Sequence, residues 1–299
     1  MLKVSGIGQC SIDYISLIDE FPAENTKLQV TPYQTFGGGP VATALVTLSR
    51  LGVKTKFIGV ISDDDAGALI KREFIKEGVD ISHIIEILNK RSQTAFILVN
   101  NNNGRRTIFW SKPTAEIQNA EVPKDFILGS SLLHLDGYLF DIAIPALIIA
   151  KKNNISVMID IGSFSEQRYD IVKLCDYVVC SEVFSDALCQ GDHEKTLKKL
   201  IENGTIIATV TLGSRGSLTA VGNKIFHQPA YVVKAVDTTG AGDVFHGGYI
   251  YGLINKWDIV DTLKFASASA AIKCLKLGGR DGIADLETVK DFINKKNNF

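Results

Sequence analysis

A short glycine-containing stretch ends in a carboxylate where a helix is expected to begin. Positions 237–243 read DTTGAGD, and the largely apolar stretch VFHGGYIYGL follows. Gly240, Ala241 and Gly242 can form a pocket for an anion such as phosphate, because glycines let backbone N–H groups converge and a helix N-terminus carries partial positive charge. Asp243 would repel that anion, so it needs another purpose. As a general base it could take the proton of a hydroxyl that attacks the phosphoryl group.

A second glycine stretch, FGGGPVATALVTLSRLG, occupies positions 36–52. Three glycines precede Pro40, and proline suits the first turn of a helix. Two interpretations remain open: a tightly packed turn between a strand and a helix, or a place where a ligand approaches bare backbone at Gly38 and Gly39. The dinucleotide-binding fingerprint does not fit, because Ala42 stands where its third glycine would be.

Polar residues follow several predicted strands. Asp13 comes just after the first strand, in GIGQCSIDY, and Asp136 has the same place in HLDGY. Ligands of open α/β sheets bind at the carboxyl ends of the strands, so each carboxylate could hold sugar hydroxyls, or it could cap a turn. VTLGSRGSL, at 210–218, is either a hairpin turn or a loop under the base and ribose of a nucleotide. The candidate nucleotide contacts in it are Thr211, Gly213, Ser214 and Gly216.

Apolar strands alternate with amphipathic helices along most of the chain, which predicts an α/β fold with a largely parallel, buried central sheet. Two segments, 14–36 and 92–112, instead carry the alternation of half-buried strands, and NNNNGRR at 100–106 is typical of a hairpin turn. We expect these segments to form a small projecting sheet that covers a ligand cleft or a partner subunit. No linker divides the chain, so we expect a single domain over 1–299.

Composition excludes several classes of protein. The 299 residues are 45% hydrophobic and carry a net charge of −1, so nothing favours nucleic acid or a membrane surface as a partner. There is no apolar run of the ~18–20 residues that a membrane span needs, and no signal-peptide pattern. The five cysteines form no CxxC pair, which indicates reduced thiols in a cytoplasmic protein. His246, three residues after Asp243, is expected to pack or to support the site rather than to catalyse.

Taken together, these stretches resemble the ribokinase-like (PfkB-type) carbohydrate kinases over nearly the whole chain. DTTGAGD matches the family's C-terminal signature, and FGGGPVATALVTLSRLG matches its N-terminal glycine motif, about 200 residues earlier. Asp13 matches the early substrate aspartate, and VTLGSRGSL matches the nucleotide loop. The resemblance implies a Rossmann-like ribokinase fold with a β lid over the sugar. It also implies transfer of the γ-phosphate of ATP to a sugar hydroxyl, with Mg²⁺.

The family's roles carry over to the matching positions. Asp243 would be the base, with Gly240, Ala241 and Gly242 as the anion hole. The sugar would be held by Asp13, Gly38, Gly39, Asp136 and Thr43, the last standing where many relatives have asparagine. Thr43 keeps a hydroxyl but lacks the paired donor and acceptor of an amide.

The resemblance also implies ions. Glu182, in VVCSEVF, matches a glutamate that acts on Mg²⁺, here through water, since Mg²⁺ usually keeps several waters. Asp237 matches a residue that in some members helps to bind a monovalent cation such as K⁺ beside the anion hole. KLGGRDGI, at 276–283, would form the other wall of that cation site.

The motif variants look most like a branch that includes sulfofructose kinases and ketohexokinase-like sugar kinases. The sulfonated substrate is not carried over, because Trp110 and Tyr138 fall where an anion-binding residue would be wanted. Arg105 and Arg106 could reach an acidic or phosphorylated sugar, or be solvated. Two alternatives stay open: a nucleoside or vitamin-alcohol kinase, and a non-catalytic sensor. A homodimer through the lid is also expected.

Overall fold

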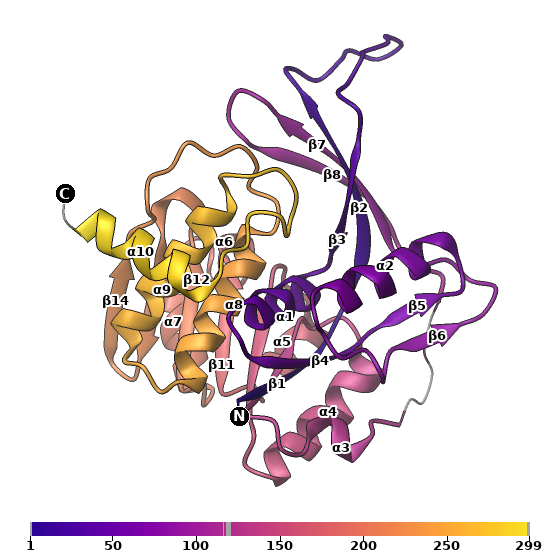
Figure 1. The fold of residues 1–299 in the computed structure, drawn as a ribbon. Coiled ribbons are helices and arrows are strands. Elements are labelled where there is room, and N and C mark those ends of the chain that lie inside the picture. The colour runs from indigo at the N-terminus through magenta and orange to yellow at the C-terminus, as the bar shows by residue number, and fades with distance from the viewer. Residues whose placement is uncertain (1, 116, 118–120, 298–299) are drawn as a thin grey trace.

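The body of the protein is built on one eight-stranded sheet (Figure 1). The computed structural model describes residues 2–115, 117 and 121–297. In spatial order the strands are β14 (Lys224–Gln228), β13 (Ser217–Val221), β12 (Ile207–Thr211), β11 (Tyr177–Ser181), β10 (Ser156–Ile161), β9 (Leu132–Leu135), β1 (Lys3–Ile7) and β4 (Lys54–Ile58). Neighbours from β4 to β12 are parallel, and β13 and β14 are antiparallel to theirs. The predicted α/β class and largely parallel sheet are confirmed.

Helices cover both faces of this sheet (Figure 1). One face carries α1 (Pro40–Arg50), α2 (Asp65–Lys76), α8 (Ala241–Ile254), α9 (Ile259–Lys273) and α10 (Leu286–Asn297), and the other carries α3 (Lys124–Ile127), α4 (Phe140–Lys152), α5 (Glu166–Val172), α6 (Glu182–Cys189) and α7 (His193–Glu202). Successive strand residues serve opposite faces: Leu132 packs with the first set of helices and Leu133 with the second. Both positions must therefore be apolar, which explains the continuous apolar runs of the sequence.

A second sheet projects from the body (Figure 1). Its order is β3 (Gln34–Gly38), β2 (Ser11–Ile18), β7 (Thr94–Asn100) and β8 (Arg106–Ser111), and we call it the projecting sheet. It forms from two separate segments of the chain, as the alternation predicted, with the expected β7–β8 hairpin turn. A small two-stranded sheet, β5 (Val60–Ser62) with β6 (Ile85–Ile87), completes the strands that the structure describes.

The expected β-structure over 14–36 is wrong in its middle. Residues 19–33 belong to no helix or strand, and they are exposed. Pro22 and Pro32 interrupt this stretch, and proline cannot donate to a strand ladder. Strand β2 also begins earlier than predicted, at Ser11.

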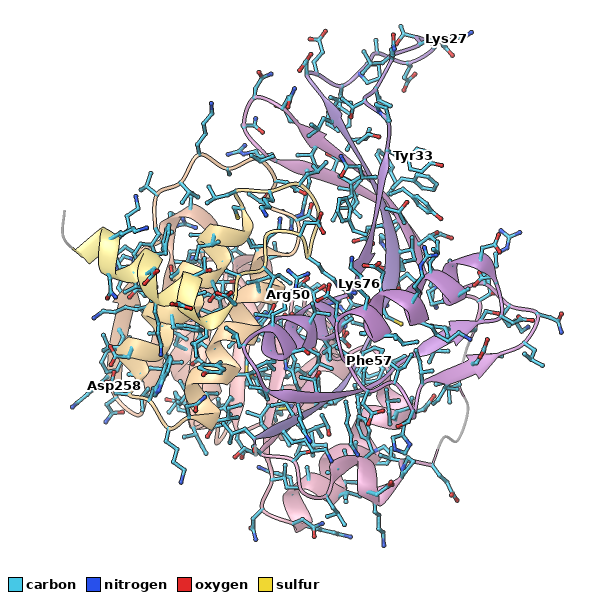
Figure 2. The ribbon with its side chains drawn as sticks, in the orientation of Figure 1. Lys27, Tyr33, Arg50, Phe57, Lys76 and Asp258 are labelled. Atoms are coloured by element: carbon cyan, nitrogen blue, oxygen red, sulfur yellow. The ribbon has the colours of Figure 1, made fainter. Side chains whose placement is uncertain are left out.

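Arg50, near the centre of the body, ties α1 to a loop from the end of the chain (Figure 2). Its guanidinium lies 2.7 Å from the Glu77 carboxylate and donates to the carbonyl oxygens of Arg280 and Ile283, each at 2.9 Å. These contacts hold the loop, residues 278–283, against the end of α1.

Two expectations from composition can be compared with the structure. All five cysteines are buried and free, as predicted. Among the described residues, no helix is both long and apolar enough to cross a membrane.

Candidate active site

The predicted anion pocket lies at the start of α8. Gly240 has φ 74°, and a Cβ atom there would lie 2.8 Å from the carbonyl oxygen of Gly279, so only glycine fits. Within the described residues, the backbone N–H groups of Gly240, Gly242 and Asp243 donate to no protein acceptor, whereas that of Ala241 donates to Thr238 O at 3.3 Å. We call residues 237–243 the anion loop. Its free donors are those a bound anion needs.

The Asp243 side chain stands beside these donors without a partner of its own. It is partly buried and forms no hydrogen bond or ion pair with the residues that the structure describes. Burial raises the pKa of Asp243 to about 7, helped by the charges of Asp160 and Asp13 and opposed by those of His246 and Arg106. A carboxylate with such a pKa can accept a proton near neutral pH.

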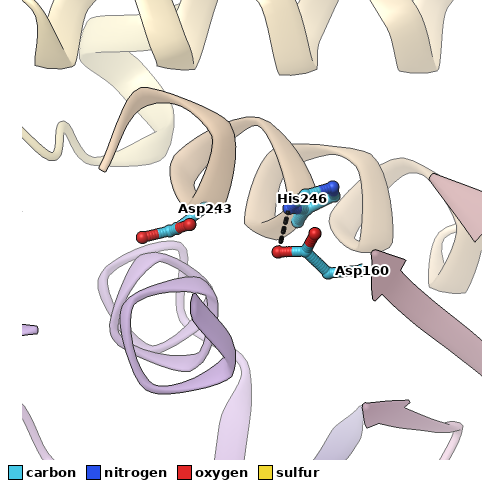
Figure 3. A group of neighbouring side chains, drawn as sticks. All are labelled: Asp160, Asp243 and His246. Atoms are coloured by element: carbon cyan, nitrogen blue, oxygen red, sulfur yellow. Dashed lines mark ion pairs between the residues drawn. The ribbon is translucent and has the colours of Figure 1, made fainter. Parts of the chain in front are cut away.

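Asp160, at the end of β10, and His246, one helical turn after Asp243, form an ion pair behind the base (Figure 3). His246 Nδ1 lies 3.0 Å from Asp160 Oδ2, and the polar atoms of these two residues and Asp243 all lie within 4.8 Å of one another. Burial by itself lowers the pKa of His246, but the Asp160 carboxylate and then Asp243 outweigh it and raise that pKa. The two carboxylates therefore favour the protonated form of His246.

Asp13 lies on the other side of the cluster, on β2 of the projecting sheet. Its Oδ1 accepts a hydrogen bond from Ser11 Oγ at 2.8 Å. A Cβ atom on Gly38 would lie 2.3 Å from Asp13 Oδ2, so the glycine leaves the room that this carboxylate occupies. Burial raises the pKa of Asp13, and Ser11 and Arg280 oppose the shift.

Arg280, in the 278–283 loop, is a buried cation that the sequence interpretation did not single out. Its Nη2 donates to Gly38 O at 2.9 Å and its Nε to Thr43 Oγ1 at 3.3 Å. A Cβ atom on Gly37 would lie 2.1 Å from Arg280 Nη1. Arg280 thus donates a hydrogen bond to the Thr43 hydroxyl and holds the first glycine motif through Gly38.

Asp136 behaves differently from Asp13. Its Oδ2 accepts from the Gln9 N–H at 2.7 Å, and its Oδ1 accepts from the Tyr138 N–H at 3.2 Å. Burial raises its pKa to about 7, although the Gln9 hydrogen bond opposes this. The turn-capping interpretation accounts for both contacts. Beside it, the Arg168 guanidinium stacks over the Tyr138 ring, 4.3 Å from the centroid.

The predicted nucleotide loop and Glu182 lie together at the ends of β11 and β12. The segment 212–216 is a hairpin turn: Leu212 N–H donates to Gly216 O at 2.8 Å, and the antiparallel strand β13 follows. Arg215 from this turn pairs with Glu182 Oε1, and His193 Nε2 lies 3.7 Å from the same oxygen. The described ion pairs and the side-chain hydrogen bond of Glu182 all use Oε1, so Oε2 of its half-exposed carboxylate has no partner among the described residues.

Asp237, at the start of the anion loop, is fully buried, and each of its three oxygens accepts a hydrogen bond. Its Oδ1 accepts from the Thr239 N–H and its Oδ2 from the Gly278 N–H, each at 2.8 Å. Its carbonyl oxygen accepts from Lys273 Nζ, also at 2.8 Å. Asp237 thereby joins the anion loop to the end of α9 and to the 278–283 loop.

The hairpin turn of the projecting sheet rests on the anion loop. Thr238 donates to Gly104 O through both its N–H (3.2 Å) and its hydroxyl (3.1 Å), and Arg106 Nη1 donates to Thr238 Oγ1 at 3.1 Å. For the Arg105 side chain the structure shows no contact, in agreement with solvation. Arg106 alone of this pair reaches the site.

The sequence interpretation did not single out three charged residues that lie at or beside the site: Asp160, Lys273 and Arg280. Asp160 and Lys273 are the only charges in apolar segments, the strand ISVMIDIG and the helix segment FASASAAIKC, whereas Arg280 lies in a glycine-rich loop next to Asp281. A charge in a segment that must be buried was the available signal, because such a charge needs a partner.

A carboxylate and neighbouring amide donors that have no partner in the described part of the chain, at the carboxyl edge of a parallel sheet, suit an enzyme that moves a phosphoryl group to an alcohol. Comparison with known proteins agrees. A family model described as pfkB family carbohydrate kinase matches residues 1–286. The chain belongs to this family, and it is a carbohydrate kinase.

Individual relatives are similar over their full length. The ribokinase of Haemophilus influenzae is 25% identical over 299 residues, which cover 96% of this chain and 97% of that one. The 5-dehydro-2-deoxygluconokinase of Clostridium perfringens is 27% identical over 317 residues, covering 97% and 92%. The crystal structure of a ribokinase from Thermotoga maritima matches with a TM-score of 0.82 and 28% identity, over 98% of this chain and all of that one.

Proposed function

We propose that the protein phosphorylates a hydroxyl of a sugar or sugar-like alcohol with ATP, using Asp243 as the general base. The observation that carries this proposal is the start of α8, where a carboxylate adjoins the N–H groups of Gly240 and Gly242, and none of these groups has a partner among the described residues. The two features suit the two halves of one reaction. The carboxylate receives a proton, and the amides receive negative charge.

In this reaction the alcohol gives its proton to Asp243 as its oxygen bonds to the γ-phosphorus. The bond between that phosphorus and the bridging oxygen breaks, and ADP leaves with the electron pair. The free amides of the anion loop stabilise the charge on the transferred phosphoryl oxygens, and one such donor is typically worth ~10²–10³ in rate. Gly240, Ala241 and Gly242 were the predicted donors; the Asp243 N–H is a further one, and the Ala241 N–H is the least available.

The nucleotide and its metal belong at the neighbouring strand ends. We assign the ATP base and ribose to the hairpin turn with Thr211, Gly213, Ser214 and Gly216. Glu182 would hold Mg²⁺ through a water on its Oε2, and Mg²⁺, when bound, neutralises charge on the phosphates. Binding ATP there would rearrange the Arg215–Glu182 pair, which is half-exposed and so costs little to open.

The sugar belongs between the two sheets. Asp13 is the carboxylate best placed to hold its hydroxyls, because its only described hydrogen bond is to Ser11 and it lies close enough to Asp243 to raise that residue's pKa. Gly38 and Gly39 shape this wall. Thr43 acts indirectly through Arg280, and Asp136 holds the β1–β2 connection through Gln9.

A homodimer through the projecting sheet remains part of the proposal. Tyr14 stacks on Phe96 at 5.2 Å and meets Tyr33 edge-on at 5.7 Å, and Phe96, Phe109 and Tyr33 are all more than half exposed. An aromatic strip of this kind favours burial against a second copy. Light scattering that finds a monomer at micromolar concentration would contradict it.

The function is tested by ADP release from Mg²⁺-ATP with ketoses, pentoses, sugar acids, sugar phosphates, nucleosides and vitamin alcohols offered in turn. We expect a sugar or sugar acid to give the highest kcat/KM. Preference for a nucleoside or vitamin alcohol would replace the substrate class but keep the mechanism. Binding of a sugar without turnover of any alcohol would favour the sensor alternative.

A further inference from the structure

Lys273 is a fully buried lysine at the end of α9, in the place where the family resemblance led us to expect a monovalent cation site. Among the residues that the structure describes, the only hydrogen bond of its side chain is the 2.8 Å contact from Nζ to the carbonyl oxygen of Asp237. A buried ammonium is costly unless it is compensated, so its position at the first residue of the anion loop calls for an explanation.

The surroundings compensate the charge in two ways. Lys273 ends a helix of 15 residues, and the C-terminus of a helix favours a cation. Burial lowers the pKa of Lys273, but the Asp237 and Asp243 carboxylates oppose this and favour the charged form. The positive charge of Arg106, by contrast, lowers the pKa of Lys273 further.

The same arrangement leaves a potassium ion little to bind. K⁺ needs several oxygen atoms to replace its hydration shell. All three oxygens of Asp237 already accept hydrogen bonds, from Thr239, Gly278 and Lys273. An ion beside that residue would also face a buried ammonium, and two like charges in a poorly solvated site repel strongly. These residues therefore do not fit a K⁺ site.

We propose that the Lys273 ammonium is a built-in substitute for the monovalent cation, so that this kinase works without potassium. The ammonium binds the Asp237 carbonyl, holds the first residue of the anion loop and places a fixed positive charge near the phosphoryl-transfer site. The inference rests on the proposed function, because it assigns the charge a role in holding that loop.

The first test is the cation dependence of the wild-type enzyme. ADP release is measured with the best alcohol of the screen in tetramethylammonium chloride, and K⁺ then replaces that cation at constant ionic strength. We expect the same kcat throughout. Marked activation of the wild type by K⁺ would overturn the proposal, whatever the variants do.

The second test replaces Lys273 and asks whether K⁺ can take the place of its ammonium. Lys273→Ala removes the ammonium and leaves space, so we expect kcat without K⁺ to fall by about tenfold or more and K⁺ to restore part of it. Lys273→Met removes the charge but fills the space, so its loss should resist K⁺. Lys290→Ala removes an exposed lysine of α10, away from this site, and should match the wild type. A folded Lys273→Ala variant as active as the wild type without K⁺ would also overturn the proposal.

A binding readout separates this inference from the kinase assignment. We expect K⁺ to raise the melting temperature of Lys273→Ala but not that of the wild type, because an ion that binds only the folded state stabilises it. This comparison needs no substrate and remains decisive if the wild type phosphorylates none of the alcohols. Equal stabilisation of both proteins by K⁺ would place the ion elsewhere and contradict the proposal.

Discussion

The two glycine motifs of this chain look alike in sequence and differ in what surrounds them. At Gly37, Gly38 and Gly39 the space of a Cβ atom is already filled, by Arg280 Nη1 at 2.1 Å, Asp13 Oδ2 at 2.3 Å and Gln9 O at 2.3 Å. At Gly242 a Cβ atom would meet nothing within 4 Å, and the N–H is free. The first motif packs against the rest of the protein, whereas in the second Gly240 packs against Gly279 and Gly242 leaves backbone open to a ligand.

The largest expected effect is a loss of turnover on replacing Asp243, the residue that follows Gly242. Asp243→Asn should lower kcat by ~10²–10⁴, the usual contribution of a general base, with the KM for ATP nearly unchanged. The amide is similar in size but cannot take the proton. ADP release with saturating substrates measures it.

Asp261→Asn is the matched control, because Asp261 is an exposed acid in the first turn of α9. It should keep wild-type turnover. An Asp243→Asn enzyme with the same kcat as this control would show that the carboxylate is not the base.

Alanine substitutions compare the two motifs directly. Gly39 has φ 98°, and a Cβ atom would contact the backbone of Gln9, so Gly39→Ala should lower the free energy of unfolding by about 1–3 kcal/mol or more. Gly242→Ala should keep or slightly raise stability, by at most about 1 kcal/mol, because alanine is the better helix former, but it should lower kcat. Urea denaturation and turnover of both variants check this. Similar losses of stability in the two would mean that Gly242 is packed as well.

The same difference explains how far the sequence could be interpreted. The buried strands and the anion loop depend on local patterns, so the fold and the start of α8 could be predicted. Arg280 contacts Gly38, 242 residues earlier, and Lys273 contacts Asp237, 36 residues earlier. Whether a glycine motif is filled or open depends on such distant partners, and no local pattern encodes them. The irregular 19–33 segment was mispredicted as a strand because the prediction followed the alternation of residues and not its two prolines, which cannot donate to a strand ladder.

The charges around Asp243 predict a pH dependence. Burial, and after it the charge of Asp160, raises the pKa of Asp243 to about 7. Because the base must be ionised to act, kcat/KM should be low below this pH and should rise as the pH passes through it. Asp13 acts in the same direction as Asp160, whereas His246 and Arg106 lower this pKa.

His246→Gln removes one of the opposing charges, so the acid limb of the profile should move to higher pH. Rates between pH 5 and 9 measure the shift, with His83→Gln as the control, because His83 lies beside Asp125 and Phe126 rather than beside the site residues. A profile that stays in place in His246→Gln would mean that the Asp160–His246 pair only packs, and that the free amides and Arg106 set the acidity of the base.

The smallest effect concerns two neighbouring arginines at the hairpin turn. Arg106 donates to Thr238 of the anion loop, and the Arg105 side chain makes no contact among the described residues. Arg106→Ala should raise the sugar KM severalfold, since an exposed contact of this kind is worth about 1 kcal/mol, while Arg105→Ala should match the wild type. Arg106→Ala should also move the acid limb to higher pH, since Arg106 lowers the pKa of Asp243. A raised KM in both variants would indicate that the net charge of the turn steers an anionic substrate, whereas no change in either would mean that the hairpin leaves the anion loop before the sugar binds.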